Sequence, residues 1–573
     1  MRTSICNLWL PALIAVVVLG ACDAGDGERG AAGGDVPEEQ RYGGTVVVAS
    51  IGDLQSMNGL TSSDFNSNSI QREMLFMPLV KYDENIEPLP WLAERWDTVR
   101  VGTDSLDLTF HLRRDIRWHD GPPTTAADVL FTFERAVDPR TAFPNAAFFD
   151  HYSRRAELID PYTIRFRLRQ QPDMFDPWVQ TPIMPRHLLS EVPPDQLLQH
   201  PFGTSVPVGN GPFRFVRRVP GQEWVFEANP DFPEALGGRP YLDRFVYRSI
   251  PEMTTLLTEL LTGRIDVYLG VNPNQTDQIK NSQGIELEAY PFRQWVFIAW
   301  NTRRPQFQDA RVRRALSMAI DRQQIVEALL YGYGEVGRGT LTPAHWAFDR
   351  NDAQTLLPYD TAQARQLLAE AGWTPGPDGI LRDPRGREFR FTLITNQGNE
   401  VRRDIMEIVQ AQLRPLGIVA TPRLVEWNTM VQTLQSRARN FDAVVSSWVV
   451  DFRQDDRDIL HSANVDAPYQ YVGYRNPRVD VLIDSLTLVM DRDRGRQLWT
   501  EYQRLVVQDA PYTPLYYPLR LVGIRSRLQG ADMDVRGDLV NVRDWWILPN
   551  QRRAGEATGA QPGAPADTAA QTN

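Results

Sequence analysis

Apolar and polar residues alternate along this 573-residue chain with the period of strands in some segments and of helices in others. Residues 45–49 form a short apolar run that is typical of a buried strand. Tyr162, Ile164, Phe166 and Leu168 alternate with threonine and arginine. This alternation predicts a strand that turns one face to the solvent.

Helical periodicity appears between the strand-like segments. Helix-forming residues fill 364–371, where Asp360 is placed to cap the helix and Gly372 to end it. Further helices are predicted at 312–319, 323–330, 400–414, 429–437 and 491–508. The strand-like run 441–450 follows one of them. Because strands and helices alternate, we expect an α/β fold in which helices cover parallel strands.

The first 22 residues carry the pattern of an export signal. Arg2 is followed by an apolar run over residues 8–19, shorter than the ~20 apolar residues of a membrane span. The run ends in the letters LGAC, which resemble the lipobox of bacterial lipoproteins and place a lipid on Cys22. We therefore expect residues 1–21 to be a lipoprotein signal peptide. An ordinary signal peptide with a small-residue cleavage site is the alternative.

Both ends of the mature chain contain too few large apolar residues to form a hydrophobic core. Residues 23–41 are rich in glycine, alanine and acids and lack aromatic side chains until Tyr42, so residues 22–41 are expected to be a lipidated, flexible tether. Residues 551–573 are expected to be a disordered tail. Cleavage would remove Cys6 and acylation would occupy Cys22, the only other cysteine, so disulfides and cysteine chemistry are not expected.

Composition narrows the class of function. A chain of this length exceeds one hydrophobic core, and 42% hydrophobic residues are ample for two or three domains. The net charge of −11, without a long basic run, argues against a nucleic-acid partner. The seven histidines are scattered, and no nucleophile elbow or zinc-protease motif occurs. Residues 332–337 match the dinucleotide fingerprint in spacing but follow a predicted helix, which indicates a helix-exit loop. We expect no catalytic residue, no metal site and no cofactor.

Ordered motifs over roughly 500 residues carry a resemblance to a known family. They include GGTVVVASIGDLQSMNGL at 43–60, FHLRRDIRWHDG at 110–121, PVGNGPF at 207–213 and VRRALSMAIDR at 312–322. These segments resemble the bacterial extracellular solute-binding proteins of family 5. That family supplies the substrate-binding lipoproteins of peptide- and nickel-type ABC importers.

The resemblance implies an α/β, bilobed type II periplasmic-binding-protein fold with an additional third domain. Residues 42–85, 206–300 and 515–550 would form lobe I, and residues 86–205 the extra domain. Residues 301–514 would form lobe II. The ligand would lie between the lobes, which close over it by a hinge movement.

The resemblance also implies a function. The protein would capture peptides between its lobes and deliver them to the permease and ATPase subunits of an ABC importer. It would act as a monomer, tethered by its lipid to a membrane and facing the periplasm or the cell exterior. The alternatives are a nickel complex, an opine or an oligosaccharide as ligand, a role as sensor or chaperone, and a secreted hydrolase.

Three residues are implied to contact the ligand. The spacing Trp448-x-x-Asp451 resembles the segment with which oligopeptide binders hold a peptide α-ammonium, and Trp427 resembles a second aromatic residue of the pocket. A solvent-exposed acid at a strand end and a core tryptophan are the alternatives for Asp451 and Trp427. Residues 395–399 lack the arginine with which dipeptide binders hold a ligand carboxylate, and Arg402 and Arg403 are the candidates to replace it.

Overall fold

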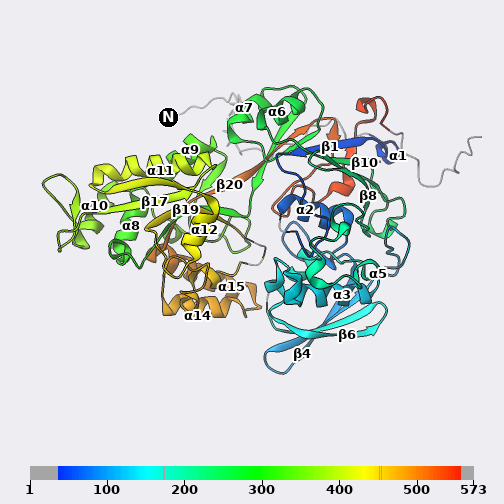
Figure 1. Cartoon of the computed structure of the whole chain (residues 1–573), viewed down its shortest axis with the longest axis horizontal. Helices are drawn as coiled ribbons and strands as arrows, with labels where there is room; N and C mark the ends of the chain where they lie inside the picture. The colour runs from blue at the N-terminus through cyan, green and yellow to red at the C-terminus, as the bar shows by residue number, and fades with distance from the viewer. Residues whose placement is uncertain (1–35, 63, 172–173, 451, 453, 557–573) are drawn as a thin grey trace, which may run out of the picture.

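The computed structural model describes residues 36–62, 64–171, 174–450, 452 and 454–556. Two lobes lie side by side with strand β20 between them, and a third domain lies below the first lobe (Figure 1). Among the described residues, no helix is both long enough and apolar enough to cross a membrane. The division into two lobes and an extra domain agrees with the expected architecture.

The first lobe is built on one half of a twelve-stranded sheet. Its strands run in the order β11 (Val267–Leu269), β1 (Thr45–Ser50), β10 (Arg244–Ser249), β9 (Glu223–Ala228) and β8 (Phe213–Val219). The predicted strand at residues 45–49 is β1, which pairs in parallel with both neighbours, β10 and β11. Val46 and Val48 pack into the large core on one face, whereas Ala49 packs with helix α6 (Met253–Leu261) on the other. Both faces of β1 are therefore buried, as its continuous apolar run predicts.

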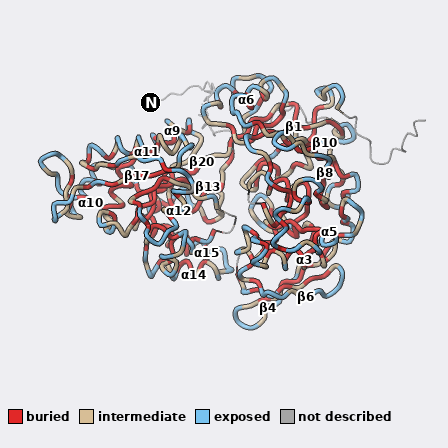
Figure 2. Tube along the Cα trace, viewed as in Figure 1, coloured by how far each residue is buried: buried red, intermediate tan, exposed pale blue. Residues whose placement is uncertain are grey.

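The second lobe carries the other half of the sheet. Its strands run in the order β18 (Val419–Val425), β17 (Arg390–Asn396), β19 (Ala443–Val449), β13 (Gln294–Trp300) and β20 (Tyr512–Arg525). Along β13, Val296, Ile298 and Trp300 enter one core, and Trp295 and Phe297 enter the other. This alternation gives the lobe two hydrophobic cores, one on each face of the sheet. Figure 2 shows the buried strands inside a rim of exposed helix surface.

Helices cover both faces of this second half-sheet. One core contains residues of α8 (Ala310–Met318), α9 (Arg322–Leu330), α10 (Thr361–Glu370) and α11 (Glu400–Leu413). The other contains residues of α12 (Trp427–Gln435), α14 (Pro477–Leu486) and α15 (Arg492–Asp509). The helices expected at 312–319, 323–330, 364–371, 400–414, 429–437 and 491–508 are all present, with ends that differ by at most three residues.

The chain crosses between the lobes along β20 and between β12 and β13. The first part of β20 pairs with β13 and β14 (Gly334–Val336), and its later part pairs with β11 and β12 (Ile285–Pro291). The changeover falls between Pro518 and Leu519. The lobe boundaries expected at 300/301 and 514/515 are therefore wrong by several residues, because β13 and the start of β20 are hydrogen-bonded into the second lobe.

The extra domain is a four-stranded antiparallel sheet with a helix packed against it. The strands run in the order β4 (Ala93–Val101), β5 (Ser105–Leu112), β7 (Thr163–Arg169) and β6 (Tyr152–Asp160), and the helix is α3 (Ala126–Val137). The fully buried Trp178 lies 4.7 Å from the ring centre of Phe166 and 5.1 Å from that of Phe149. This aromatic cluster is continuous with the core of the first lobe, so the two units pack as one body.

Short elements complete the part of the chain that the structure describes. The helices are α2 (Phe65–Ile70), α4 (Asp176–Gln180), α5 (Arg186–Leu189), α7 (Thr276–Lys280) and α13 (Arg457–Leu460). The strand pairs are β2 (Val80–Tyr82) with β3 (Pro88–Pro90), β15 (Thr374–Pro375) with β16 (Leu381–Arg382), and β21 (Leu528–Gln529) with β22 (Trp546–Ile547).

The expected flexible tether over residues 22–41 is wrong for its last residues. They form the short helix α1 (Glu38–Arg41), whose end is held by the chain's other terminus. Arg552 donates a hydrogen bond to the Gln40 carbonyl oxygen at 2.7 Å, and the Arg41 guanidinium lies over the ring of Trp546. These contacts fix residues that their composition alone leaves free. Residues 1–35, with Cys22 and the signal peptide, lie outside the described residues.

The expected disordered tail over residues 551–573 is likewise wrong at its start. Glu556 is almost buried and pairs with the guanidinium of Arg527 at 3.0 Å. Arg553 reaches the carboxylate of Asp266 at 2.7 Å. Two buried charges of the first lobe thus order residues that carry no large apolar side chain. Residues 557–573 lie outside the described residues.

Candidate ligand-binding site

A cavity of about 260 Å³ lies where the second lobe meets the first lobe and the extra domain. The first lobe and the extra domain together contribute Tyr82, Ile86, Glu87, Pro88 and Phe175 to its lining. From the second lobe it is lined by His345 and Trp346, by residues 454–456, and by side chains of α14 and α15. A pocket that draws on both bodies in this way is typical of a ligand site between lobes.

An ion pair and an aromatic contact join the two sides of the cavity. The guanidinium of Arg492, at the start of α15, lies 2.6 Å from the carboxylate of Glu87. The ring of Phe452 packs edge-on against Tyr82 with centroids 5.4 Å apart, and the Arg293 guanidinium lies 4.0 Å from the centre of the Phe452 ring. The walls of the cavity are thus brought together from segments far apart in the sequence.

A buried polar network includes three residues that line the cavity, Gln454, Asp456 and Tyr502. The Asp456 carboxylate is 3% exposed and accepts hydrogen bonds from the Tyr502 hydroxyl at 2.5 Å, from the Thr340 hydroxyl, and from the amide of Gln454. Burial raises the pKa of Asp456, against the lowering effect of these donors. Gln503 donates to Thr340 at 2.9 Å and ties the network to α15. The network fixes the polar side chains that face the cavity.

The predicted tryptophans lie near the end of β19 and the start of α12, outside the lining of the cavity. The Trp448 ring stacks against Tyr471 and Phe297, with ring centroids 6.1 and 6.4 Å apart. Trp427 is 52% exposed at the start of α12, so it is not a core tryptophan. Asp451 lies outside the described residues. Its contact with a ligand and those of both tryptophans stay predictions.

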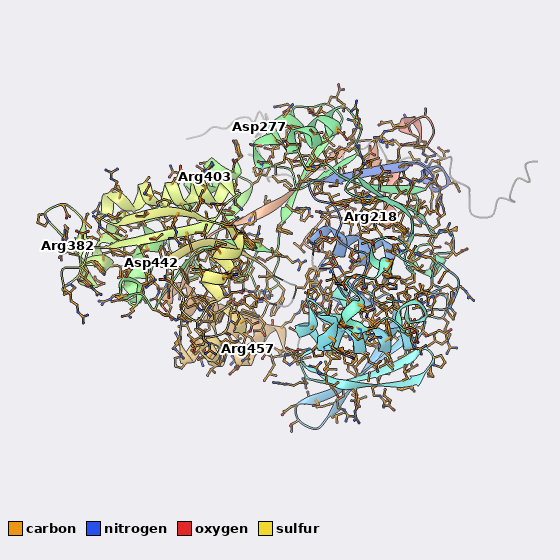
Figure 3. All side chains as sticks on the ribbon, in the orientation of Figure 1. Arg218, Asp277, Arg382, Arg403, Asp442 and Arg457 are labelled. Carbon is orange, nitrogen blue, oxygen red and sulfur yellow. The ribbon has the colours of Figure 1, made fainter. Side chains whose placement is uncertain are left out.

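The two candidate arginines of α11 differ in their surroundings. Arg403, labelled in Figure 3, pairs with the carboxylate of Asp404 at 2.8 Å and is exposed. Arg402 instead donates to the neutral side chains of Asn396 at 2.9 Å and Ser447 at 2.6 Å. Burial lowers the pKa of Arg402. Because these partners are neutral, whereas Arg403 is paired with a carboxylate, Arg402 is the better placed of the two to meet a ligand carboxylate.

Histidine, cysteine and acidic side chains are the usual protein ligands of metal ions. Among them, no group of three or more histidine, cysteine, aspartate or glutamate side chains is arranged to hold a metal ion. His119 donates to the Gly211 carbonyl oxygen at 3.0 Å, as a structural histidine does. His345, by contrast, lines the cavity.

Sequence reasoning missed three residues of the site. His345, Gln454 and Asp456 stand in segments without strand or helix periodicity, so no pattern singled them out. The paired acids at 455–456, directly after the Trp448 motif, were the one local signal that could have drawn attention to this loop.

Residues 87–466 match the family described as bacterial extracellular solute-binding proteins, family 5. The chain is 32% identical over 539 residues to the oligopeptide-binding protein AppA of Bacillus subtilis, covering 93% of this chain and 97% of that protein. It is 26% identical over 497 residues to heme-binding protein A of Haemophilus influenzae, covering 82% and 86%. This chain belongs to the family 5 solute-binding proteins.

Solved structures agree on the fold. The B. subtilis AppA structure, in complex with a nonapeptide, superimposes with a TM-score of 0.73 and covers 89% of this chain and 99% of that chain. NikZ of Campylobacter jejuni, in complex with Ni(L-His), gives a TM-score of 0.72 at 22% identity, covering 89% and 100%. The bilobed type II periplasmic-binding-protein fold with a third domain is thereby confirmed.

Proposed function

We propose that this protein captures peptides between its lobes and delivers them to the permease and ATPase of an ABC importer. The observation that carries the proposal is the likeness, over nearly the whole chain, to an oligopeptide-binding protein whose solved structure holds a nonapeptide. The cavity between the lobes supplies a place where both bodies can contact one ligand.

The proposed contacts divide the peptide between charged and aromatic residues. Asp451 binds the peptide α-ammonium, because a buried ammonium requires a carboxylate partner. Trp448 and Trp427 pack against the peptide, and Arg402 meets a carboxylate or carbonyl oxygen. The role of Asp451 rests on its spacing from Trp448 in the sequence.

The proposal also places the protein in the cell envelope, anchored to a membrane by a lipid. Residues 1–21 direct export, Cys22 carries the lipid, and the chain from there to α1 spans from the membrane to the folded domains. The protein faces the periplasm or the cell exterior and acts as a monomer. It has no catalytic role, so peptides should leave it intact.

The test begins with the bound ligand. Purified protein is denatured, the released molecules are identified by mass spectrometry, and matching synthetic peptides are titrated by calorimetry. Asp451→Asn should weaken binding more than a hundredfold, since breaking a buried charge pair costs about 3–5 kcal/mol. Asp466→Asn, at an exposed aspartate of the same lobe, should leave binding unchanged.

N-acetylation of the peptide separates the parts of the proposal. It should weaken binding to the wild type and add little in Asp451→Asn, because both changes remove the same pair. Equal affinity of the wild type for free and acetylated peptide would contradict the role of Asp451. Absence of peptide binding, or cleavage of the peptides, would contradict the proposed function itself.

A further inference from the structure

Gln454 presents an acceptor that the described residues leave unused. Its side chain is 9% exposed and lines the cavity between the lobes. Its Nε2 donates to a carboxylate oxygen of Asp456 at 2.5 Å, which fixes the amide orientation, since the flipped amide would set oxygen against oxygen. Among the described residues its Oε1 has no hydrogen-bond partner. A buried acceptor without a partner is rare in folded proteins and calls for a donor from outside the chain.

His345 presents a donor to the same cavity. Its Nδ1 accepts the backbone N–H of Ala347 at 3.1 Å, so the neutral ring carries its proton on Nε2. Burial lowers the pKa of His345 to about 3, and the charges of Arg492 and Arg496 lower it further, so the ring is neutral at pH 7. The ring is held in place by Trp346, stacked at 5.5 Å, and by the edge of Trp499 at 5.1 Å.

The two groups belong to one recognition surface. Both residues line the main cavity and also the narrow pocket of about 10 Å³ beside it. Gln454 offers a fixed hydrogen-bond acceptor, and His345 offers a fixed donor. A chemical group with both an N–H and a carbonyl oxygen can satisfy them together, and that group is an amide.

We infer that His345 and Gln454 together bind one amide group of the ligand, His345 Nε2–H donating to its oxygen and Gln454 Oε1 accepting from its nitrogen. This inference rests on the proposed function, because it assumes that a peptide occupies the cavity. A carboxylate would meet repulsion from Gln454 Oε1 and from the neighbouring Asp456. An ammonium would meet the N–H of His345. As a pair, His345 and Gln454 thus match a neutral amide better than either charged group.

The remaining walls suit the part of the ligand that carries the amide. Ile86, Ile483, Leu486 and Val489 also line the cavity and offer apolar contact to an aliphatic stem. The amide comes from one of two sources: the side chain of glutamine or asparagine, or a peptide bond of the main chain. The two sources share one chemistry, and the experiment separates them.

The experiment uses full-length protein and two sets of alanine-based peptides. In the first set, Gln, Glu or Met stands at each position in turn. In the second, each peptide bond in turn is N-methylated. If a side-chain amide is bound, Gln at one position should bind roughly tenfold more tightly than Glu or Met, the effect of one buried hydrogen bond left unmade. If a main-chain amide is bound, one N-methylation should cause a similar loss.

Variants tie the effect to the two residues. Gln454→Met should abolish the preference or the N-methyl effect, and so should His345→Phe, which keeps the ring contacts and removes the donor. Gln366→Met is the matched control, because Gln366 also donates its Nε2 to a carboxylate, that of Glu370, but on the exposed face of α10. Melting temperatures establish that each variant is folded. If Gln454→Met does not fold, His345→Phe decides alone.

The outcomes are distinguishable. Peptides that bind the wild type with neither preference, or that keep their preference in both variants, overturn the amide site and leave the proposed function standing. If no peptide binds the wild type, the proposed function fails and the amide site fails with it.

Discussion

Replacing Asp266 by asparagine should destabilise the first lobe more than any exposed substitution. Its carboxylate is fully buried and accepts two hydrogen bonds from Arg527, at 2.7 and 3.0 Å. It also accepts from Arg553 at 2.7 Å and from the backbone N–H of Val47 in β1 at 2.9 Å. One side chain thereby joins β1, the segment after β20 and the end of the described chain. By itself burial lowers the pKa of Arg527, and the hydrogen bonds and charges of Asp266 and Glu556 raise it overall.

The expected loss follows from leaving Arg527 without its main partner. Breaking a buried ion pair by removing one member costs about 3–5 kcal/mol, because the remaining charge stays desolvated. For domains of 150–250 residues each kcal/mol corresponds to about 2–4 °C in melting temperature, which gives a fall of roughly 6–20 °C. Differential scanning calorimetry can resolve the transition of the first lobe from that of the second.

An ion pair of the same geometry, in which the aspartate is exposed, serves as the control. Asp115 also accepts two hydrogen bonds from one arginine, Arg113, but its side chain is 47% exposed. Asp115→Asn should lower the melting temperature by no more than about 2–3 °C. Equal shifts for the two variants would refute the reasoning. The double variant, Asp266→Asn with Arg527→Met, should lose less free energy of unfolding than the two single variants together. Each single substitution leaves the charge of the other residue buried without this partner, and the double variant removes both charges.

Three further outcomes are expected. Burial lowers the pKa of His119 to about 4, so the free energy of unfolding should fall as the pH drops from 6.5 towards 4, by up to about 1.4 kcal/mol per pH unit. In His119→Gln, the urea concentration at the unfolding midpoint should depend less on pH over that range. Arg402→Met should weaken the binding of peptides with a free carboxylate roughly tenfold to a hundredfold, whereas Arg403→Met, at an arginine paired with Asp404, should not. Cys22→Ser should move the protein from the membrane fraction to the soluble fraction or block its processing; wild-type protein found soluble with a free thiol would contradict lipid anchoring.

Local patterns were enough to predict most helices and strands. Ile164, Phe166 and Leu168 are all buried on β7, because a strand with one wet face needs an apolar residue at every second position. Asp360 accepts the backbone N–H of Gln363 at the first turn of α10, as the predicted helix cap should. These signals lie within a few residues of the elements they define, which is why the sequence displays them.

Local patterns could not predict contacts between residues that lie far apart in the sequence. Glycine- and alanine-rich termini gave no sign that Arg552 would hold α1 or that Arg527 would hold Glu556, because those contacts join residues distant in sequence. The cavity shows the same limit. The partners of Asp456 come from positions 340 and 502, and neither segment differs in composition from its surroundings. Only the fold brings them together.

The weakness of the contacts across the cavity bears on how the lobes close. Glu87 and Arg492 are each 50% exposed, and exposed ion pairs contribute about 0–1 kcal/mol. The packing of Phe452 on Tyr82 adds about 0.5–1.5 kcal/mol, as an aromatic pair does. Interactions of this size shift an open–closed equilibrium by tenfold or so and do not fix it. A ligand that buries its surface against both walls therefore has the larger influence on this equilibrium, since His345 and Gln454 line the narrow pocket from the second lobe and Ile86 lines it from the opposite side.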